Sequence, residues 1–256
     1  SVSGLTVGAE KAWDYAGQNR VGRMFIVNQM DRENADFTKV LNELREKYGT
    51  SVVPLIVPIG AGPNFTGVVN VLENKAWEGS GKALKEVPVP DSMSAAIEEA
   101  MAEMTEAAAE ADDELLEKYF DEGELTPEEV RRGFRAGMKS GKIAPVVCCS
   151  ALTGVGIAAL MDMMVSYTNS PKDTVAVGVD PKSGEEAKRV CNNDEPFSAF
   201  VFKSIADPFV GKLSLVRVMS GSLTPATALY NASSDKAEKS GGLYIQRGKK
   251  QTNVQV

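Results

Sequence analysis

The sequence predicts an α/β fold that combines a partial parallel sheet, an inserted α+β subdomain and a partial antiparallel β-barrel domain. Three observations support this prediction. Residues 23–27, 37–48 and 52–59 have the patterns of strand, helix and strand, the order that builds a parallel sheet. Residues 61–142 then mix strand and helix patterns before a buried strand pattern returns. After Pro196, apolar and polar residues alternate as they do in antiparallel strands.

The elements of the parallel part follow from their local patterns. Residues 5–18 have a helical pattern, and residues 23–27 form a short apolar strand. In residues 37–48 the apolar side chains recur at helical spacing, with Asp36 placed to cap the helix and Gly49 placed to end it. Ligands of parallel sheets bind at the carboxyl ends of the strands, so the residues that follow the first strand are candidates for a binding site.

The inserted part begins with strand patterns and continues with helices. Residues 65–72 predict one strand, and residues 75–77 predict another. Residues 91–119 are rich in Ala, Glu and Met and predict one long helix. A second helix is predicted from Thr126, because Pro follows this residue and Glu lies three positions after it, as in a capping box. Residues 143–149 then return to a buried strand pattern.

A last helix is predicted before Pro171, and we interpret Met161, Met163 and Met164 as residues of the core. Residues 171–194 are polar and lack periodicity, which predicts a linker. The predicted apolar face of the last helix comprises Ile157, Leu160, Met161, Met164 and Val165.

The whole chain is predicted to divide into five parts: the C-terminal part of a nucleotide-binding domain (1–60), the inserted subdomain (61–142), the last strand and helix of the first domain (143–170), the linker (171–194) and the β-barrel domain (195–256).

Composition indicates an ordinary globular protein, with 43% hydrophobic and 25% charged residues among 256. No apolar run reaches membrane-spanning length and the N-terminus does not resemble a signal peptide, so we expect a cytoplasmic protein without a membrane contact. The chain has no histidine, which excludes histidine-based catalysis and histidine metal sites. The chain has three cysteines, which are too few for a disulfide framework and do not have the spacing of metal ligands. We therefore expect the adjacent Cys148 and Cys149 to be small buried residues of a strand.

Charge is distributed unevenly around a net value of −7. Residues 91–139 carry 15 acidic and 5 basic side chains, whereas residues 195–256 carry 4 acidic and 8 basic ones. The acidic block repels nucleic acid and would favour a basic protein partner, but its default interpretation is a solvated helix face. The basic C-terminal part is compatible with a position near phosphate groups.

Two short segments carry the chemistry of base recognition. Asn28 and Asp31 have the Asn-x-x-Asp spacing directly after an apolar run, and Ser150-Ala151-Leu152 follows a second such run. An aspartate carboxylate can accept hydrogen bonds from both N1–H and the 2-amino group of guanine, whereas adenine lacks this donor pair. A backbone N–H of the Ser-Ala pair can donate to guanine O6. The sequence therefore predicts a guanine-binding site.

The phosphate-binding half of such a site is missing from the sequence. A Gly-x-x-x-x-Gly-Lys-Ser/Thr loop is needed to hold the phosphates, and none is present. The nearest segment is Gly79-Ser80-Gly81-Lys82, but Ala76 stands at its first glycine position and Ala83 follows the lysine. We interpret it as an ordinary loop and expect this chain alone to be inactive, with no catalytic residue and no metal site of its own.

The segment of residues 27–37 resembles the guanine-reading segment of bacterial elongation factor G, a multidomain translational GTPase. Other parts resemble that family in the same order along the chain. Residues 3–10 resemble the stretch after its second switch, and residues 58–60 with 65–69 resemble the start of its inserted subdomain. A helix of that subdomain resembles residues 114–119, and the second domain of the family resembles residues 207–213, 217–218 and 220–221. The resemblance implies a sheet of the P-loop GTPase type. Because the matching segments begin partway through that domain, we expect this chain to be a fragment of such a GTPase.

The resemblance also assigns roles to single residues. Asn28 would hold the base and steady the phosphate loop, and Asp31 would read guanine N1 and N2. Ser150 and Ala151, followed by Leu152, would close over O6. Gln29 departs from the family pattern, which has a lysine whose stem lies along the base and whose ammonium reaches the ribose. We therefore expect weaker nucleotide binding with guanine selectivity retained.

The resemblance implies a parent protein that binds GTP or GDP with Mg²⁺, hydrolyses GTP on the ribosome and promotes translocation. The acidic insert would face the ribosomal stalk protein, and the second domain would lie near small-subunit RNA. We expect no tightly bound nucleotide in this chain alone, and dimerisation through exposed sheet edges. Two alternatives stay open: a ribosomal protection or release-factor-type GTPase, and a ribosome-binding module that does not hydrolyse GTP.

Overall fold

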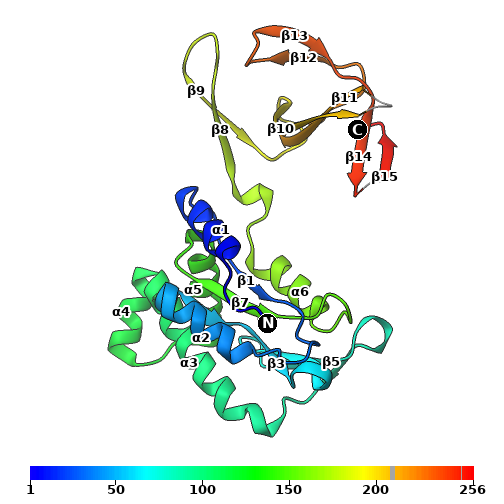
Figure 1. The fold of residues 1–256 in the computed structure, drawn as a ribbon. Helices are drawn as coiled ribbons and strands as arrows, with labels where there is room; N and C mark the ends of the chain where they lie inside the picture. Colours follow the sequence, from blue (N-terminus) through cyan, green and yellow to red (C-terminus); the bar gives the residue numbers. More distant parts are fainter. Residues whose placement is uncertain (208–210, 249) are drawn as a thin grey trace. The chain divides into compact units, whose positions relative to one another are not determined.

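The computed structural model describes residues 1–207, 211–248 and 250–256 (Figure 1). The chain divides into two compact units, Ser1–Thr168 and Asn169–Val256. The first is an α/β unit with a parallel sheet, and the second is built from antiparallel strands. The predicted fold class is therefore confirmed. None of the helices in the described part is long and apolar enough to cross a membrane.

A three-stranded parallel sheet forms the centre of the first unit. Its strand order is β1 (Phe25–Val27), β7 (Ala144–Cys148) and β2 (Val52–Pro54). Every residue of β7 is buried, which is expected of a central strand covered on both faces. Helices α1 (Val7–Gln18) and α2 (Phe37–Tyr48) belong to the same unit.

Helix α2 confirms the predicted boundaries. Asp36 Oδ1 accepts the N–H of Lys39 at 2.8 Å, and Gly49 follows the last turn with a φ of +75°. Its buried side chains are Phe37, Val40, Leu41 and Leu44. The cap satisfies a backbone donor that would otherwise have no partner in the first turn.

The predicted strand over residues 52–59 is wrong in one respect, because the structure divides it between two sheets. Strand β2 ends at Pro54 in the parallel sheet, and β3 (Ile56–Ile59) belongs to an antiparallel sheet. Leu55 lies between them: its N–H donates to Val146 O of β7 at 2.9 Å, and its carbonyl accepts the N–H of Val71 at 2.9 Å. A single residue therefore serves both sheets.

The antiparallel sheet of the insert has the strand order β3-β4-β5-β6. Its further strands are β4 (Gly67–Asn70), β5 (Lys75–Glu78) and β6 (Lys85–Val87). The first two match the predicted strand patterns, whereas β6 was not predicted because its three residues are mostly polar and exposed. Short 3₁₀ turns η2 (Gly62–Asn64) and η3 (Gly81–Ala83) lie between these strands.

The single helix predicted over residues 91–119 is also wrong. The structure has a 3₁₀ turn η4 (Asp91–Met93), α3 (Ser94–Ala111) and α4 (Asp113–Glu122). Asp112 breaks the run in an extended conformation and its Oδ1 accepts the N–H groups of Glu114 and Leu115. Aspartate competes with the helix backbone in this way, so it ends one helix and caps the next.

Helix α5 (Pro127–Ser140) begins with the predicted capping box. Thr126 Oγ1 accepts the N–H of Glu129 at 3.4 Å, and the Glu129 carboxylate accepts the N–H of Thr126 at 2.8 Å. The helix packs against α3 at Gly133, where a Cβ atom would lie 2.4 Å from Ala108 O. The close helix approach therefore requires glycine at this position.

Helix α6 (Ile157–Tyr167) is present, but its predicted buried face is only partly right, because Leu160 is buried and Ile157 packs against the core while the other three residues are exposed. Met161 and Val165 are 53% and 84% exposed, and Met164 is 39% exposed. The buried stripe is Ala159, Leu160, Met163 and Tyr167. The helix is apolar around most of its circumference, so periodicity alone does not indicate which face meets the sheet.

The second unit corrects the predicted linker over residues 171–194. That region contains a 3₁₀ turn η5 (Pro171–Asp173) and an antiparallel hairpin of β8 (Val175–Val179) and β9 (Glu186–Val190). Asp180 Oδ1 accepts the N–H groups of Lys182 and Ser183 and so closes the turn. Most of the side chains of β8 and β9 are exposed, which gave the sequence little alternation.

The remaining strands of the second unit pair as antiparallel hairpins, as the alternation predicted. The pairs are β10 (Ser198–Asp207) with β11 (Gly211–Ser220), β12 (Ala228–Asn231) with β13 (Lys236–Lys239), and β14 (Leu243–Arg247) with β15 (Lys250–Val254). Within the segment 207–213 used for the family resemblance, residues 208–210 lie outside the described part of the chain.

A small polar network joins three elements of the first unit. Tyr167 of α6 donates its hydroxyl to Glu73 Oε1 at 2.5 Å, and Arg131 of α5 donates Nε to the same oxygen at 3.2 Å. Burial opposes ionisation of Glu73, but the bonds from Tyr167 and Arg131 outweigh it and hold the pKa of Glu73 below its usual 4.5. Burial and the bond to Glu73 raise the pKa of Tyr167. This network fastens α6 to the insert.

We expect Tyr167→Phe to lower the free energy of unfolding of the first unit by about 1 kcal/mol at pH 7, because Glu73 loses a hydrogen-bond donor. A depressed carboxyl pKa stabilises the fold above the unfolded-state value, and this contribution is lost as the pH falls through the folded-state value. The difference from wild type should therefore shrink below pH 4.5. Urea unfolding measures it, with exposed Tyr15→Phe as the control. A pH-independent difference would contradict the prediction.

Candidate functional site

Parallel pairing of β1 with β7 brings the two predicted segments together. Val27 lies opposite Cys148 in the register, so both strands end at the same edge of the sheet. The N–H of Cys149 donates to Val27 O at 3.1 Å, and the N–H of Met30 donates to Cys149 O at 3.3 Å. Two loops far apart in sequence therefore share one edge, where parallel sheets bind their ligands.

Asn28 connects the two loops through its side chain. Its Oδ1 accepts the N–H of Gln29 at 2.7 Å and the N–H of Ala151 at 2.9 Å. Both partners are backbone donors, so the accepting atom must be the amide oxygen. We expected a backbone N–H of the Ser150-Ala151 pair to be offered to guanine O6, but both N–H groups already have partners in this structure, Val155 O and Asn28 Oδ1. The sequence did not indicate these contacts.

Asp31 carries a carboxylate oxygen without a partner. Its Oδ1 is shielded from solvent and accepts no hydrogen bond from the described residues. A shielded carboxylate oxygen without a donor costs free energy, which a ligand with matching N–H groups can recover. Asp31 follows the fully buried Met30, whose packing fixes the start of the loop. Asp31 therefore keeps one unused acceptor at the edge of the sheet where the two loops meet.

Gln29 is exposed and has a left-handed backbone, with a φ of +64°. Such a conformation is uncommon for a residue other than glycine and occurs often at binding sites. Arg32 Nη1 donates to Gln29 Oε1 at 3.2 Å. A guanidinium charge thus lies beside the residue that replaces the lysine of the family pattern.

Ser150 shapes its loop from inside. It is fully buried, and its Oγ accepts the N–H of Thr153 at 3.1 Å. Its N–H donates to Val155 O at 2.9 Å, and its carbonyl accepts the N–H of Gly154 at 2.8 Å. Leu152, at the tip of the loop, is 88% exposed. Ser150 therefore forms the loop, and the exposed residues beyond it are the ones that a ligand can reach.

The two adjacent cysteines are buried, as predicted. Burial raises the pKa of the Cys148 thiol well above its ordinary value and also raises that of Cys149. Thiols that stay protonated are poor nucleophiles. The described residues contain no group of three or more Cys, Asp or Glu side chains that could hold a metal ion.

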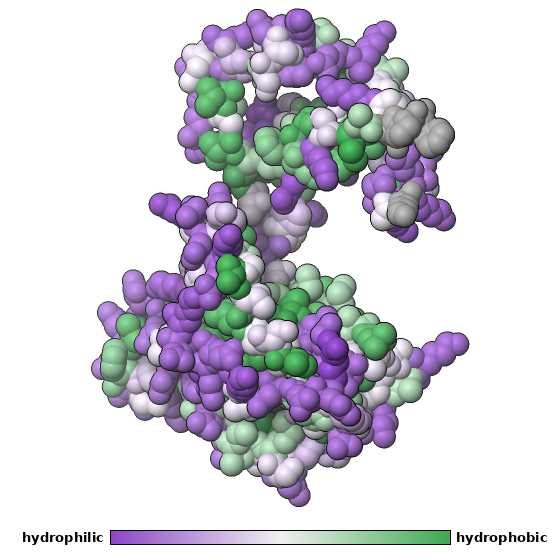
Figure 2. Space-filling view, in the orientation of Figure 1, coloured by the Kyte–Doolittle hydropathy of each residue, from purple (hydrophilic) through white to green (hydrophobic). Residues whose placement is uncertain are grey.

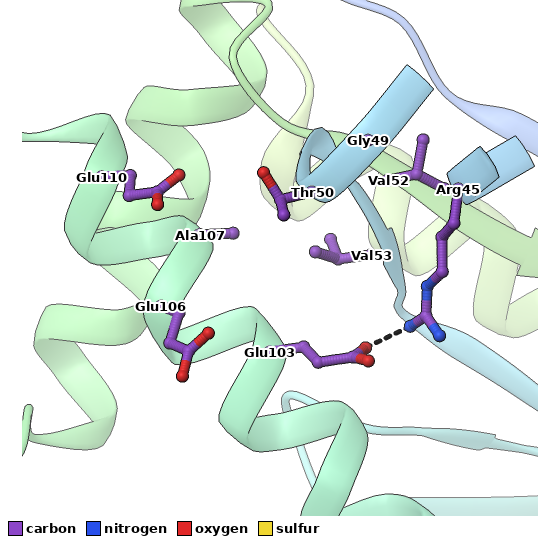
Figure 3. A pocket seen from close by; sticks show the side chains of 9 residues that line it. All are labelled: Arg45, Gly49, Thr50, Val52, Val53, Glu103, Glu106, Ala107 and Glu110. Carbon is purple, nitrogen blue, oxygen red and sulfur yellow. Dashed lines mark hydrogen bonds and ion pairs between the residues drawn. The ribbon is translucent and has the colours of Figure 1, made fainter. Parts of the chain in front are cut away.

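A separate cavity of about 280 Å³ lies between the end of α2 and helix α3 (Figure 3). The residues that line it include Val53, Arg45, Glu103, Glu106 and Glu110. Arg45 forms an ion pair with Glu103. Burial raises the pKa of Glu103, and Arg45 opposes this effect. The cavity shares no lining residue with the two loops. Figure 2 shows hydrophilic residues over much of the visible surface of the first unit, with scattered apolar patches.

Comparison with known proteins finds a family match in each of the two units. Residues 1–170 match the family described as the elongation factor Tu GTP-binding domain, and residues 196–256 match elongation factor G domain 2. A protein from Thermus thermophilus, known from its crystal structure, is similar with a TM-score of 0.79 and 27% sequence identity. The alignment covers 99% of this chain and 35% of that one, so this chain spans about a third of the length of that relative.

We expect Asn28→Ala to lower the free energy of unfolding by about 1–3 kcal/mol, because the N–H groups of Gln29 and Ala151 lose their acceptor. Asn28→Asp keeps an oxygen at the same position and should retain most of the stability. Urea unfolding of the 256-residue chain measures both variants. Equal losses in the two variants would show that the shared acceptor is not what connects the loops.

Proposed function

Because the chain belongs to the elongation factor Tu GTP-binding domain family, we propose that it is the guanine-reading part of an elongation-factor-G-like translational GTPase. The match of residues 196–256 to elongation factor G domain 2 supports this narrower assignment within the translational GTPases. The similarity to the Thermus thermophilus protein extends over both units and supports their occurrence together in a longer protein.

The observation that carries the proposal is the unpartnered Oδ1 of Asp31. Guanine offers N1–H and a 2-amino group side by side, and a carboxylate can accept from both. Adenine presents no such pair and would leave the carboxylate without donors in a shielded position. Asn28 holds the second loop beside Asp31, which brings the amides of Ala151 and Leu152 within the same site.

We assign base recognition to Asn28, Gln29, Asp31, Ser150, Ala151 and Leu152. The residues present fit a guanine base, but the sequence contains no motif for binding phosphates. The phosphates and Mg²⁺ are therefore assigned to the longer protein, where bound Mg²⁺ would assist the attack of water on the γ-phosphate. Within this chain Asp31 orients the base and Asn28 orients the loop that faces it.

The proposed role of the whole protein is ribosomal translocation in the cytoplasm. The acidic residues 91–139 support a contact with the ribosomal stalk protein, and the basic balance of residues 195–256 supports a position near small-subunit RNA. The unpaired edge of β1, where Ile26 is 47% exposed, together with the exposed Met161 and Val165 of α6, supports self-association of the chain.

One observation favours a second candidate function. Gln29 lacks the ammonium group that the family pattern supplies, which favours a ribosome-binding module that holds nucleotide weakly and does not hydrolyse it. The neighbouring Arg32 places a positive charge beside Gln29 and favours the first candidate. The guanine selectivity of the site is common to both candidates.

Guanine recognition is tested by titrating the chain with guanosine, adenosine and xanthosine and following the amide signals by NMR. We expect guanosine to bind more than about 10-fold more tightly than adenosine, because adenosine leaves Asp31 unpaired. Asp31→Asn should transfer the preference to xanthosine, whose 2-oxo group accepts from an amide nitrogen. Glu33→Gln, a loss of the same charge in the same loop, is the control. An unchanged preference in Asp31→Asn would refute the assignment.

Replacing Gln29 by lysine should tighten GDP binding about 2- to 10-fold, because an ammonium near the ribose adds one charge-assisted interaction. The ratio of guanosine to adenosine affinity should not change, since Asp31 still reads the base. Gln29→Met keeps an unbranched stem without charge and separates stacking from electrostatics. Equal GDP affinity of the Lys and wild-type chains in a direct titration would count against the role given to Gln29.

A further inference from the structure

The antiparallel sheet of the insert contacts both loops of the candidate site. From turn η2, the N–H of Gly62 donates to Met30 O at 2.9 Å. From the residue that precedes turn η3, Ser80 Oγ donates to Thr153 O at 2.8 Å. Met30 belongs to the loop that carries Asp31, and Thr153 belongs to the loop that carries Ala151. Each base-reading loop thus receives one hydrogen bond from the insert.

Glycines on both sides make the Ser80 contact possible. Gly79 has a φ of +81°, and a Cβ atom there would lie 2.5 Å from Ala83 O. Gly154 has a φ of +83°, and a Cβ atom there would lie 3.2 Å from Ser80 Cβ. A larger residue at Gly79 would distort the turn that carries Ser80, and a larger residue at Gly154 would push the loop away from Ser80. The segment Gly79-Ser80-Gly81 lacks the sequence of a phosphate-binding loop. Its backbone conformation instead lets Ser80 approach the loop at Gly154.

The bond from Ser80 holds the carbonyl of Thr153 from outside, in a loop whose other hydrogen bonds come mostly from its own residues. Ala151, Leu152 and Thr153 are exposed. The N–H of Thr153 is held by Ser150 Oγ, and its carbonyl is held by Ser80. Both ends of the Thr153 residue are thereby fixed, which limits the rotation of the peptide groups that follow Ala151.

We propose that Ser80 is a positioning residue for guanine recognition. Its hydroxyl, supplied by the insert, holds the Ser150–Gly154 loop in the conformation in which the N–H of Leu152, which donates to no described residue, is offered to O6 of a guanine base. Ser80 acts through Thr153 and does not itself touch the base. This inference rests on the proposed function and extends it, because it makes the affinity of the base site depend on the inserted sheet.

The test uses the 256-residue chain and its variants Ser80→Ala, Ser80→Thr and Ser51→Ala. Ser51 is the matched control, because its hydroxyl also donates to a backbone carbonyl, Tyr48 O, at 3.0 Å, but outside both loops. Dissociation constants for guanosine and inosine are measured by NMR titration. Hydrogen exchange is measured at the amides of Gly154 and of strand β7.

Ser80→Ala should weaken guanosine and inosine binding by the same factor, about 2- to 10-fold, the size of one lost hydrogen bond. Both nucleosides carry O6, whereas only guanosine carries the 2-amino group that Asp31 reads, so their affinity ratio should stay constant. Exchange at the amide of Gly154 should accelerate while exchange in β7 stays unchanged. Ser80→Thr should restore both readouts, and Ser51→Ala should leave both at the wild-type level.

The outcomes separate the inference from the proposed function. A wild-type chain that does not prefer guanosine to adenosine would overturn the proposed function and this inference with it. A wild-type chain with that preference, together with a Ser80→Ala variant of unchanged guanosine affinity and unchanged Gly154 exchange, would overturn the inference alone. Equal losses of affinity in Ser80→Ala and Ser51→Ala would also overturn it, because a general loss of stability would then explain the effect.

Discussion

The candidate site depends on the parallel pairing of β1 with β7. All five residues of β7 are buried and the strand is covered on both faces, so β7 is held at the centre of the sheet and pairs with β1 along the length of β1. In this register Val27 lies opposite Cys148, and the polar residues that follow the two strands meet at one edge. A shift by one residue would turn the buried side chains to opposite faces and move Asn28 away from Ala151. Burial of an apolar strand therefore determines where the polar loops come together.

Leu55 extends this constraint to the insert. Its N–H bonds to the parallel sheet and its carbonyl bonds to the residue after β4, so the antiparallel sheet begins at a fixed position relative to β7. The network of Glu73, Tyr167 and Arg131 provides a second attachment through α5 and α6. With two attachments the insert is held in place, and its turns can reach the loops at hydrogen-bonding distance.

Features with local signals were predictable from the sequence. The cap at Asp36, the capping box at Thr126 and the Asn-x-x-Asp spacing all rely on residues within four positions of one another. Features that depend on distant partners were not predictable. The split at Leu55 requires Val146 and Val71, and the bond from Ala151 to Asn28 joins residues far apart in the chain. The buried face of α6 and the hairpin of β8 and β9 were missed because neither has a clear contrast of polar and apolar sides.

The contact between Asn28 and Ala151 has a thermodynamic consequence for ligand association. A base that takes the Ala151 N–H must displace an oxygen already bonded to it, so this step exchanges one hydrogen bond for another and its net contribution is small. Asp31 Oδ1 has no bond to give up, and its contribution is close to that of a full charge-assisted bond. In the proposed site, discrimination between bases is therefore concentrated on one carboxylate.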